Sequence, residues 1–230
     1  MKITIQKSNK TAIVLGSTGL IGSHLVDELL AHPAYSKVVT LTRRKIGKEH
    51  TKLENVVVDF DRLSSFAHYF KGDDVFICLG TTRAKAGSAE AFRKVDLDYV
   101  VESAQLAKEQ GCKQCLLVSS VGADASSSML YPQTKGEAEE GVVALGFWAT
   151  HILQPSLLLG DRDEFRLGEK ISKVLFKGVD FIAGNLLGSY RPVEAEAVAK
   201  AMVVLAQKID AGTFTHPSDE LIRLSELERD

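Results

Sequence analysis

The residues of this sequence that could do chemistry are a serine pair, a tyrosine and a lysine, in that order. Tyr131 and Lys135 stand four residues apart in the stretch Y-P-Q-T-K, and Ser119 and Ser120 end an apolar stretch upstream. A free phenol has a pKa near ~10, but a lysine ammonium on the same helix face stabilises the phenolate and lowers that value. The pattern therefore predicts proton transfer at a carbonyl or alcohol oxygen.

The expected catalytic residues are Ser120, Tyr131 and Lys135. In a reduction, Tyr131 would protonate the substrate oxygen while hydride reaches the carbon, and Ser120 would donate a hydrogen bond to that oxygen. Lys135 would lower the pKa of the tyrosine and hold the nicotinamide ribose. Ser119 is the alternative to Ser120, and the sequence does not separate the two. A surface helix pair is the alternative for Y-x-x-x-K taken alone, so the assignment depends on what precedes it.

A glycine-rich turn lies near the start of the chain, between an apolar stretch at residues 12–15 and a stretch with helical periodicity. Such a turn places a pyrophosphate at a helix N-terminus, where backbone N–H groups and the helix dipole meet the negative charge. The spacing is G-x-x-G-x-x-G, for which an ordinary glycine-rich turn is the alternative. The turn residues expected to bind the cofactor are Gly16, Ser17, Thr18, Gly19, Leu20, Ile21 and Gly22.

Two arginines follow the second expected strand, where NAD-binding proteins carry an acid on the ribose 2′-hydroxyl. Here Arg43 and Arg44 occupy that place, and no acid comes before Glu49. A guanidinium pairs with a 2′-phosphate, whereas an acid repels it. The cofactor expected is therefore NADP(H), with Arg43 as the first candidate and Arg44 as the second. A solvated basic corner is the alternative.

Further cofactor contacts are expected where later strands end. The segment after the third strand would border the adenine, and the segment after the fourth would run beside the adenosine ribose. The residues concerned are Asp59 and Phe60, then Leu79, Gly80, Thr81 and Thr82, and finally Ser119, Tyr131 and Lys135.

The elements that must position these residues alternate between short apolar runs and helical periodicity, which is typical of β-α-β units. We expect strands at 11–15, 37–41, 55–58, 74–79, 114–118 and 149–154, and helices at 20–31, 89–109 and 132–145. Right-handed crossovers make this an α/β fold with a doubly wound, Rossmann-like parallel sheet in the order 3-2-1-4-5-6. Its ligand cleft lies outside the carboxyl ends of the strands, where all the segments above converge.

The length of 230 residues suits one large α/β domain. We expect residues 1–230 to form a single NAD(P)-binding domain, to which residues 161–230 contribute a small substrate-side lobe. That lobe would hold a helix near 165–176, a loop, a helix near 193–207 and a short tail.

Composition argues against several other classes. Its 28 basic and 30 acidic residues leave a net charge of −2, without the basic stripe of a nucleic-acid-binding protein. The apolar runs are shorter than the ~18 residues that span a bilayer, and the N-terminus lacks a secretory signal, so we expect a soluble, cytoplasmic protein. Cys112 and Cys115 fit small apolar residues at a strand start better than a metal or redox pair, and we expect no metal.

These residues resemble the short-chain dehydrogenase/reductase superfamily, in its atypical, extended-like branch, and more narrowly the Tat-interacting oxidoreductase-like proteins. The likeness covers most of residues 10–210 and is carried by the stretches at 78–87, 95–100, 119–124, 130–139 and 153–160. It implies an NADP(H) cofactor, with Pro155 near its carboxamide, and no particular substrate. Asp96 stands where the family often has asparagine, and Gln154 and Ser156 replace the usual arginine and glycine. By the same analogy, residues 89–109 and 132–145 form a homodimer surface.

Two functions fit this sequence. The first is an NADP(H)-dependent oxidoreductase acting on a small carbonyl or alcohol. The alternative is an NADP(H)-binding regulatory or interaction protein with little turnover, for which the cofactor sets a conformation for a protein partner. The intact Ser/Tyr/Lys set favours the enzyme, because a pure binder has no chemical need for it. The short C-terminal part favours the regulator modestly, because it offers little material for a substrate pocket.

Overall fold

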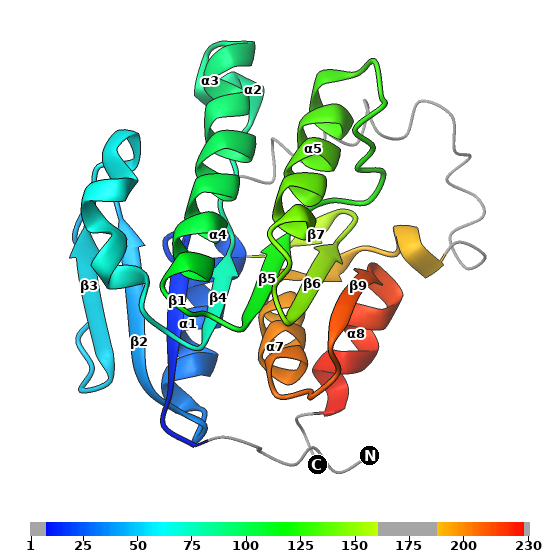
Figure 1. Ribbon diagram of the computed structural model, residues 1–230. Coiled ribbons are helices and arrows are strands. Elements are labelled where there is room, and N and C mark those ends of the chain that lie inside the picture. Colours follow the sequence, from blue (N-terminus) through cyan, green and yellow to red (C-terminus); the bar gives the residue numbers. More distant parts are fainter. Residues whose placement is uncertain (1–7, 161–187, 228–230) are drawn as a thin grey trace.

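The computed structural model describes residues 8–160 and 188–227. They form a seven-stranded parallel sheet in the order β3-β2-β1-β4-β5-β6-β9 (Figure 1). The predicted order of six strands is confirmed, with one strand added at the β6 edge. The strands are β1 Lys10–Leu15, β2 Tyr35–Thr42, β3 Leu53–Val57, β4 Asp74–Ile77, β5 Gln114–Val118, β6 Ala149–Gln154 and β9 Gly212–Pro217.

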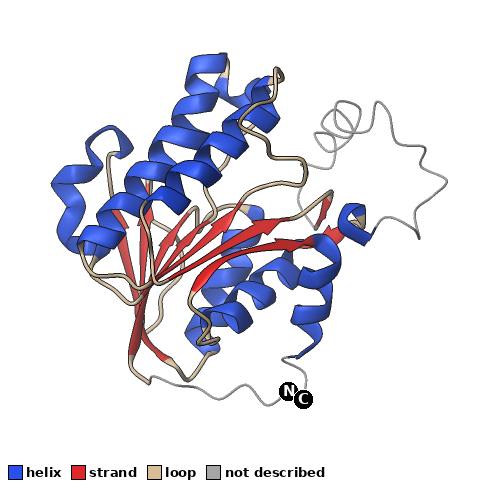
Figure 2. Cartoon of the chain, turned by 45° about the vertical axis from the view of Figure 1, so that its right-hand side comes forward, coloured by secondary structure: helices blue, strands red, loops and turns tan. Residues whose placement is uncertain are grey.

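Helices cover both faces of the sheet (Figures 1 and 2). One face carries α1 Leu20–Ala31, α7 Ala195–Ala206 and α8 Ser218–Glu226, and the other carries the 3-10 segment η1 Phe60–Phe70, α4 Tyr99–Glu109 and α5 Leu130–Ala144. The central strand β1 feeds both cores, because alternate residues of a strand point to opposite faces. Ala12 and Val14 pack on the α1 side, whereas Ile13 and Leu15 pack on the α4 side. Burial on both faces explains why this strand is a continuous apolar run.

The helix expected over residues 89–109 is a composite. It begins as α3 Ala89–Arg93, continues as a single π-helical stretch, η2 Lys94–Asp98, and ends as α4. A short helix, α2 Arg83–Ala86, precedes it, and Ser88 caps α3 by accepting a hydrogen bond from the Ala91 N–H at 3.1 Å. Because a π-helical turn holds an extra residue, it changes which side chains face inward, and such turns often lie at functional sites.

The C-terminal part joins the main sheet. After η4 Gly188–Tyr190, the two-residue strand β8 Val193–Glu194 pairs with β7 Leu158–Leu159, and α7 follows. The expectation of a short tail after residue 207 is wrong, because β9 pairs with β6 and α8 packs against α7. The strand was hidden because its sequence, G-T-F-T-H-P, is polar and carries only one large apolar side chain. The helix expected at 165–176 lies outside the described residues.

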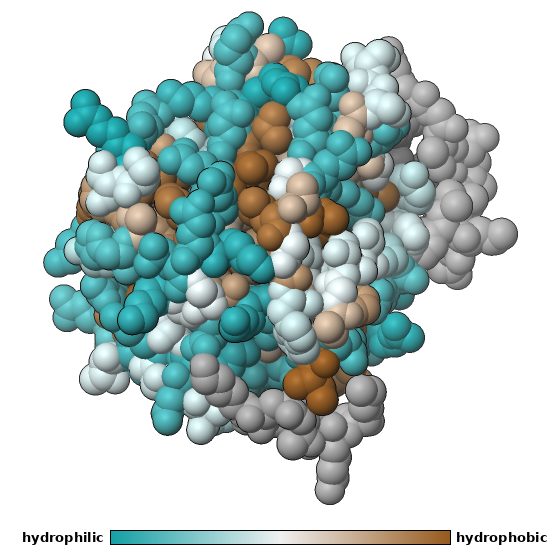
Figure 3. Space-filling view, in the orientation of Figure 1, coloured by the Kyte–Doolittle hydropathy of each residue, from teal (hydrophilic) through white to brown (hydrophobic). Residues whose placement is uncertain are grey.

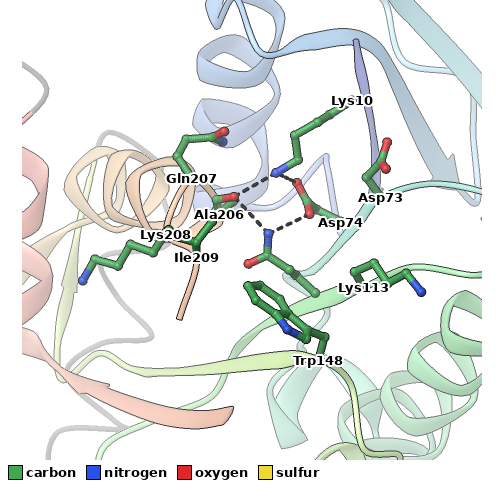
Figure 4. A pocket seen from close by; sticks show the side chains of 10 residues that line it. Lys10, Asp73, Asp74, Lys113, Trp148, Ala206, Gln207, Lys208 and Ile209 are labelled. Atoms are coloured by element: carbon green, nitrogen blue, oxygen red, sulfur yellow. Dashed lines mark hydrogen bonds and ion pairs between the residues drawn. The ribbon is translucent and has the colours of Figure 1, made fainter. Parts of the chain in front are cut away.

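A buried polar network joins the amino ends of the strands, beside a cavity of about 430 Å³ (Figure 4). Lys10 Nζ lies 2.5 Å from Asp74 Oδ2 and donates a hydrogen bond to the Ala206 carbonyl at 2.8 Å. The Tyr35 hydroxyl donates a hydrogen bond to Asp74 Oδ2 at 2.6 Å, and the Gln114 amide donates one to Asp74 Oδ1 at 3.1 Å. Burial raises the pKa of Asp74, although Lys10 and Tyr35 oppose the shift. The network ties α7 to β1, β2, β4 and β5, at the end of the sheet opposite the expected cleft.

On the face seen in Figure 3, hydrophobic side chains lie in a strip between hydrophilic helix surfaces, over the region of α4 and α5. The two helices approach closely there, because a Cβ added at Gly141 would lie 2.7 Å from Cγ2 of Val101. Val143 of α5 is exposed. Within residues 8–160 and 188–227, no helix is both long and apolar enough to cross a membrane.

Candidate active and cofactor site

The glycine turn joins the end of β1 to the start of α1 and lies against the end of β4. Gly16 has φ +83°, and a Cβ there would lie 2.4 Å from the carbonyl oxygen of Cys78. A Cβ at Gly22 would lie 2.2 Å from the oxygen of Gly16, so only glycine lets helix and turn pack this closely. Gly19 is the N-cap of α1 and supplies no side-chain cap, which leaves N–H groups of the first turn available to an anion.

A basic cavity of about 530 Å³ opens beside this turn. Its lining residues are Ser17, Thr18, Ser23, Val26, Arg43, Arg44, Lys45, Ile46, Gly47 and Lys48. The structure thus brings both predicted arginines to the turn and adds two lysines that the sequence reasoning missed, although the run R-R-K-I-G-K displays them. None of these lining residues is acidic. Ser17 is buried, and its hydroxyl has no hydrogen-bond partner within the described part of the chain.

The residues expected at the adenine have structural roles. Asp59 Oδ1 accepts a hydrogen bond from the Asp61 N–H at 3.0 Å and so caps η1. Phe60 is buried and packs on the Tyr99 ring, with the centroids 5.3 Å apart. The structure leaves Phe60 little surface for a ligand, and Asp59 remains exposed at the end of β3.

The segment after β4 connects the glycine turn to the expected catalytic residues. It leaves β4 beside Gly16, and the Thr81 N–H donates a hydrogen bond to Asp96 Oδ2 at 2.8 Å. A Cβ added at Gly80 would lie 3.5 Å from Asp96 Oδ1 and 3.8 Å from Lys135 Nζ. Thr82 caps α2 through a hydrogen bond from the Lys85 N–H at 3.2 Å. Leu79 is half-buried against the α4-side core.

Lys135 and Asp96 form a buried ion pair, with Lys135 Nζ 2.8 Å from Asp96 Oδ1. The side chains are only 8% and 1% exposed, which excludes them from solvent. Burial alone would lower the pKa of Lys135, but Asp96 and Tyr131 outweigh it and raise the pKa above its usual value. Lys135 is therefore an ammonium at neutral pH. Tyr131 lies one turn earlier on α5, half-buried, with its ring centroid 5.9 Å from that of Phe92.

The two serines differ in their surroundings. Ser119 lies near Glu139 of α5, but its buried hydroxyl has no hydrogen-bond partner within the described part of the chain. Glu139 accepts hydrogen bonds from the Gln154 amide at 2.9 and 3.1 Å. Burial raises the pKa of Glu139, and the hydrogen bonds from Gln154 and the charge of Lys135 oppose this shift. The Ser120 hydroxyl donates a local hydrogen bond to the carbonyl of the next residue at 3.3 Å. That next residue, Val121, donates its N–H to the carbonyl of Pro155 at 3.0 Å, which places Pro155 beside the loop that follows Ser120.

Cys112 and Cys115 lie at the amino end of β5, away from this site. Cys112 and Cys115 are buried free thiols, and burial raises the pKa of Cys112 to about 12 and that of Cys115 further. Cys112 donates a hydrogen bond to the Phe70 carbonyl at 3.5 Å. In the part of the chain that the structure describes, no three histidine, cysteine or acidic side chains are grouped so that they could hold a metal.

Comparison with known proteins identifies the family. The model of the NAD dependent epimerase/dehydratase family matches residues 12–144. Protein HTATIP2 of Rattus norvegicus is 48% identical over 172 residues, which cover 73% of this chain and 71% of the relative. Protein FMP52, mitochondrial, of Candida albicans is 40% identical over 205 residues, which cover 86% of this chain and 88% of the relative.

A solved structure shows the same fold. MoeE5 in complex with UDP-glucose and NAD superposes with a TM-score of 0.68 at 19% identity, covering 94% of this chain and 81% of that chain. The family model and the two relatives confirm the resemblance inferred from the sequence stretches. The chain belongs to the NAD dependent epimerase/dehydratase family of nucleotide-cofactor-binding proteins, within the atypical short-chain dehydrogenases/reductases, as a homologue of HTATIP2.

Proposed function

We propose that this protein is an NADP(H)-dependent oxidoreductase that transfers a hydride to or from a small carbonyl or alcohol substrate. The observation that carries the proposal is the buried Lys135 ammonium, one helical turn from Tyr131 and next to Gly80. Burying a lysine and a carboxylate costs desolvation energy that their attraction often fails to offset, so such a pair calls for a chemical reason. Activation of a neighbouring tyrosine supplies that reason.

The residues of the glycine turn and the basic cavity fit a dinucleotide that carries a 2′-phosphate. The uncapped start of α1 suits the pyrophosphate, and the unpartnered Ser17 hydroxyl gives the cavity a buried group able to bond a ligand oxygen. Arg43 and Arg44 would hold the 2′-phosphate, and Lys45 adds positive charge to the same cavity, whereas Lys48 is paired with Asp27 of α1. When bound, the nicotinamide ring supplies or accepts the hydride.

The acid and base work falls to three side chains. In a reduction, Tyr131 gives its phenolic proton to the substrate oxygen, and the resulting phenolate is stabilised by the Lys135 ammonium. Ser120 donates a hydrogen bond to the same oxygen as negative charge develops there. We assign this role to Ser120 and keep Ser119 as the alternative, because both side chains are equally buried, each 6% exposed. In an oxidation, the same groups run in reverse, and Tyr131 takes the proton.

A screen for NADPH oxidation with aldehydes, ketones and quinones tests the proposal. Once a substrate is found, Tyr131→Phe should lower its turnover by the ~10²–10⁴-fold that general acid catalysis supplies. NADPH affinity and thermal stability should stay unchanged, since the ring and its packing on Phe92 remain. Turnover of the variant at the parent rate would remove Tyr131 from the mechanism.

The second candidate function is cofactor-dependent regulation of a protein partner. Asp96 favours it, because this carboxylate compensates the charge with which Lys135 would activate Tyr131. Tight NADPH binding without reduction of any carbonyl in the screen would support it. The α4–α5 dimer surface stays a prediction, which the mass of the protein in solution tests. The expected cytoplasmic location also stays a prediction, because the name of the fungal relative places that protein in mitochondria.

We also propose that residues 1–230 act as one domain, with a substrate-side lobe drawn from residues 161–230. The joining of β9 and α8 to the main sheet and its helix layer supports this proposal. Limited proteolysis tests it, since a single domain yields no stable fragment that lacks the C-terminal strand and helix.

A further inference from the structure

The π-helical turn gives the candidate site a carboxylate that is held from two sides. Asp96 Oδ1 faces Lys135 Nζ at 2.8 Å, and Asp96 Oδ2 accepts a hydrogen bond from the Thr81 N–H at 2.8 Å. Asp96 is 1% exposed, so water does not screen its charge. Both contacts fix the carboxylate at the point where the segment after β4 meets α5.

The Asp96 carboxylate changes the net charge beside Lys135 from that which an uncharged side chain would leave. An amide here would leave the buried Lys135 ammonium as a net positive charge, whereas the carboxylate makes the pair neutral. Glu139, one turn beyond Lys135 on α5, adds a second acidic group close enough to act on the charge of the lysine. Arg93 does not restore the positive charge, because it is paired with Glu137.

Neutralisation matters because the two redox states of a nicotinamide differ by one positive charge on the ring. We propose that Asp96 is a specificity-determining residue that shifts this site's preference toward the oxidised, cationic cofactor. The inference rests on the proposed function and on the role expected from the sequence, in which Lys135 holds the nicotinamide ribose. A lone buried ammonium would repel the cationic ring, and Asp96 removes that repulsion. The reduced ring is neutral, so a carboxylate in place of an amide at this position does not change its binding.

Binding measurements on the full chain test the proposal without any substrate. The dissociation constants of NADP⁺ and NADPH are measured by calorimetry for the parent, Asp96→Asn and Asp96→Ser. In both variants the ratio of the NADP⁺ dissociation constant to the NADPH dissociation constant should rise by about tenfold. This is the size of effect expected from one nearby charge in a partly screened site. The serine variant keeps an acceptor for the Thr81 N–H, in case the amide disturbs folding.

Asp98→Asn is the matched control. Asp98 lies on the same π-helical turn but is exposed, so removing its charge should leave the ratio unchanged. Equal weakening of both cofactors by the Asp96 variants would show a structural role and overturn the inference, as would an unchanged ratio. Failure of the parent to bind either cofactor would overturn the proposed function together with this inference, so the two failures are distinguishable.

Discussion

Gly136 lies against the backbone of Ala125, so that a Cβ on Gly136 would be 2.1 Å from the Ala125 nitrogen. This contact joins α5 to the loop between β5 and α5, and the Asp124 N–H adds a hydrogen bond to the Pro132 carbonyl at 3.0 Å. The loop starts directly after Ser120, and the helix carries Tyr131 and Lys135. Gly136 therefore sets how the serine side of the candidate site lies relative to the tyrosine side.

Gly136→Ala should damage this alignment. Alanine suits a helix better than glycine by up to ~1 kcal/mol, but the clash is with backbone, which cannot rotate away. We expect a net loss of stability of roughly 1–3 kcal/mol, measured by denaturant unfolding. Carbonyl reduction should fall more than NADPH affinity, because the glycine turn and the basic cavity lie elsewhere.

The matched control for this variant is Gly141→Ala on the same helix. Its added Cβ would meet the Cγ2 of Val101 at 2.7 Å, and a side-chain methyl can shift where a backbone nitrogen cannot. The helix-propensity gain then offsets part of the cost. If both variants lose the same stability and activity, the loop contact of Gly136 has no special role.

Arg43→Ala tests the cofactor assignment. The parent should bind NADPH more tightly than NADH by about 10- to 150-fold, from charge-assisted contacts of Arg43 and Arg44 to the 2′-phosphate. The variant should lose most of this difference and keep its NADH affinity. Lys37→Ala removes one exposed cation that is paired with Glu54 on the neighbouring strand, and it should change neither affinity. Equal affinities of the parent for both cofactors would contradict the assignment.

The central strands and the turn could be predicted from the sequence because their causes are local. β1 is buried on both faces and must therefore be apolar throughout, and the turn favours glycine at Gly16 because its φ of +83° is a conformation that residues with a side chain rarely adopt. The basic run that begins at Arg43 lies on one short loop, so its residues stay together in space. In these cases the residues that cause a feature lie close together in the sequence, so the sequence alone displays them.

Two features could not be predicted, because their causes lie far along the chain. The π-helical turn that buries Asp96 depends on packing against α5 and on the Thr81 N–H, neither of which the local periodicity reports. The edge strand β9 is polar, and what holds it to β6 includes a buried histidine pair, His151 and His216. Polar side chains whose partners are distant in the sequence resemble those of a loop, so a strand such as β9 is not recognised from its sequence.

The histidine pair predicts acid sensitivity. His151 Nδ1 lies 3.0 Å from His216 Nε2, and burial, followed by the charges of His216 and Lys208, lowers the pKa of His151 to about 3. An unfolded histidine titrates near ~6.5. As the pH falls below that value, the unfolded chain gains a proton that the folded chain refuses. Stability present above pH ~6.5 is therefore lost between ~6.5 and about 3, by up to ~1.4 kcal/mol per pH unit.

His151→Phe separates this effect from other titrations. The phenyl ring keeps the stacking on Phe214, whose centroid lies 5.3 Å from that of His151, and it cannot take up a proton. Urea unfolding between pH 7 and pH 4 should show a shallower loss of stability for the variant than for the parent. Replacing the exposed His68 by phenylalanine should leave the parent slope unchanged. Identical slopes for the parent and His151→Phe would rule out His151 as the source.

Removing one partner of the buried pair of Lys10 and Asp74 should lower stability more than removing both partners. Asp74→Ala leaves the Lys10 ammonium, the Tyr35 hydroxyl and the Gln114 amide without their shared acceptor, so the free energy of unfolding should fall by about 3–5 kcal/mol. The double variant Lys10→Met with Asp74→Leu removes both charges and should recover part of that loss, because no buried charge remains although Tyr35 and Gln114 still lack the Asp74 acceptor.

The exposed pair of Lys37 and Glu54 supplies the comparison for this network. Their side chains are 50% and 41% exposed, and Glu54→Ala should cost less than ~1 kcal/mol. Denaturant unfolding of the four proteins at neutral pH makes the test. If Asp74→Ala is as mild as Glu54→Ala, the network in Figure 4 does not hold the amino ends of the strands together. If the double variant is no better than Asp74→Ala, the cost comes from lost packing or from the lost hydrogen bonds of Tyr35 and Gln114, and not from an unpaired charge.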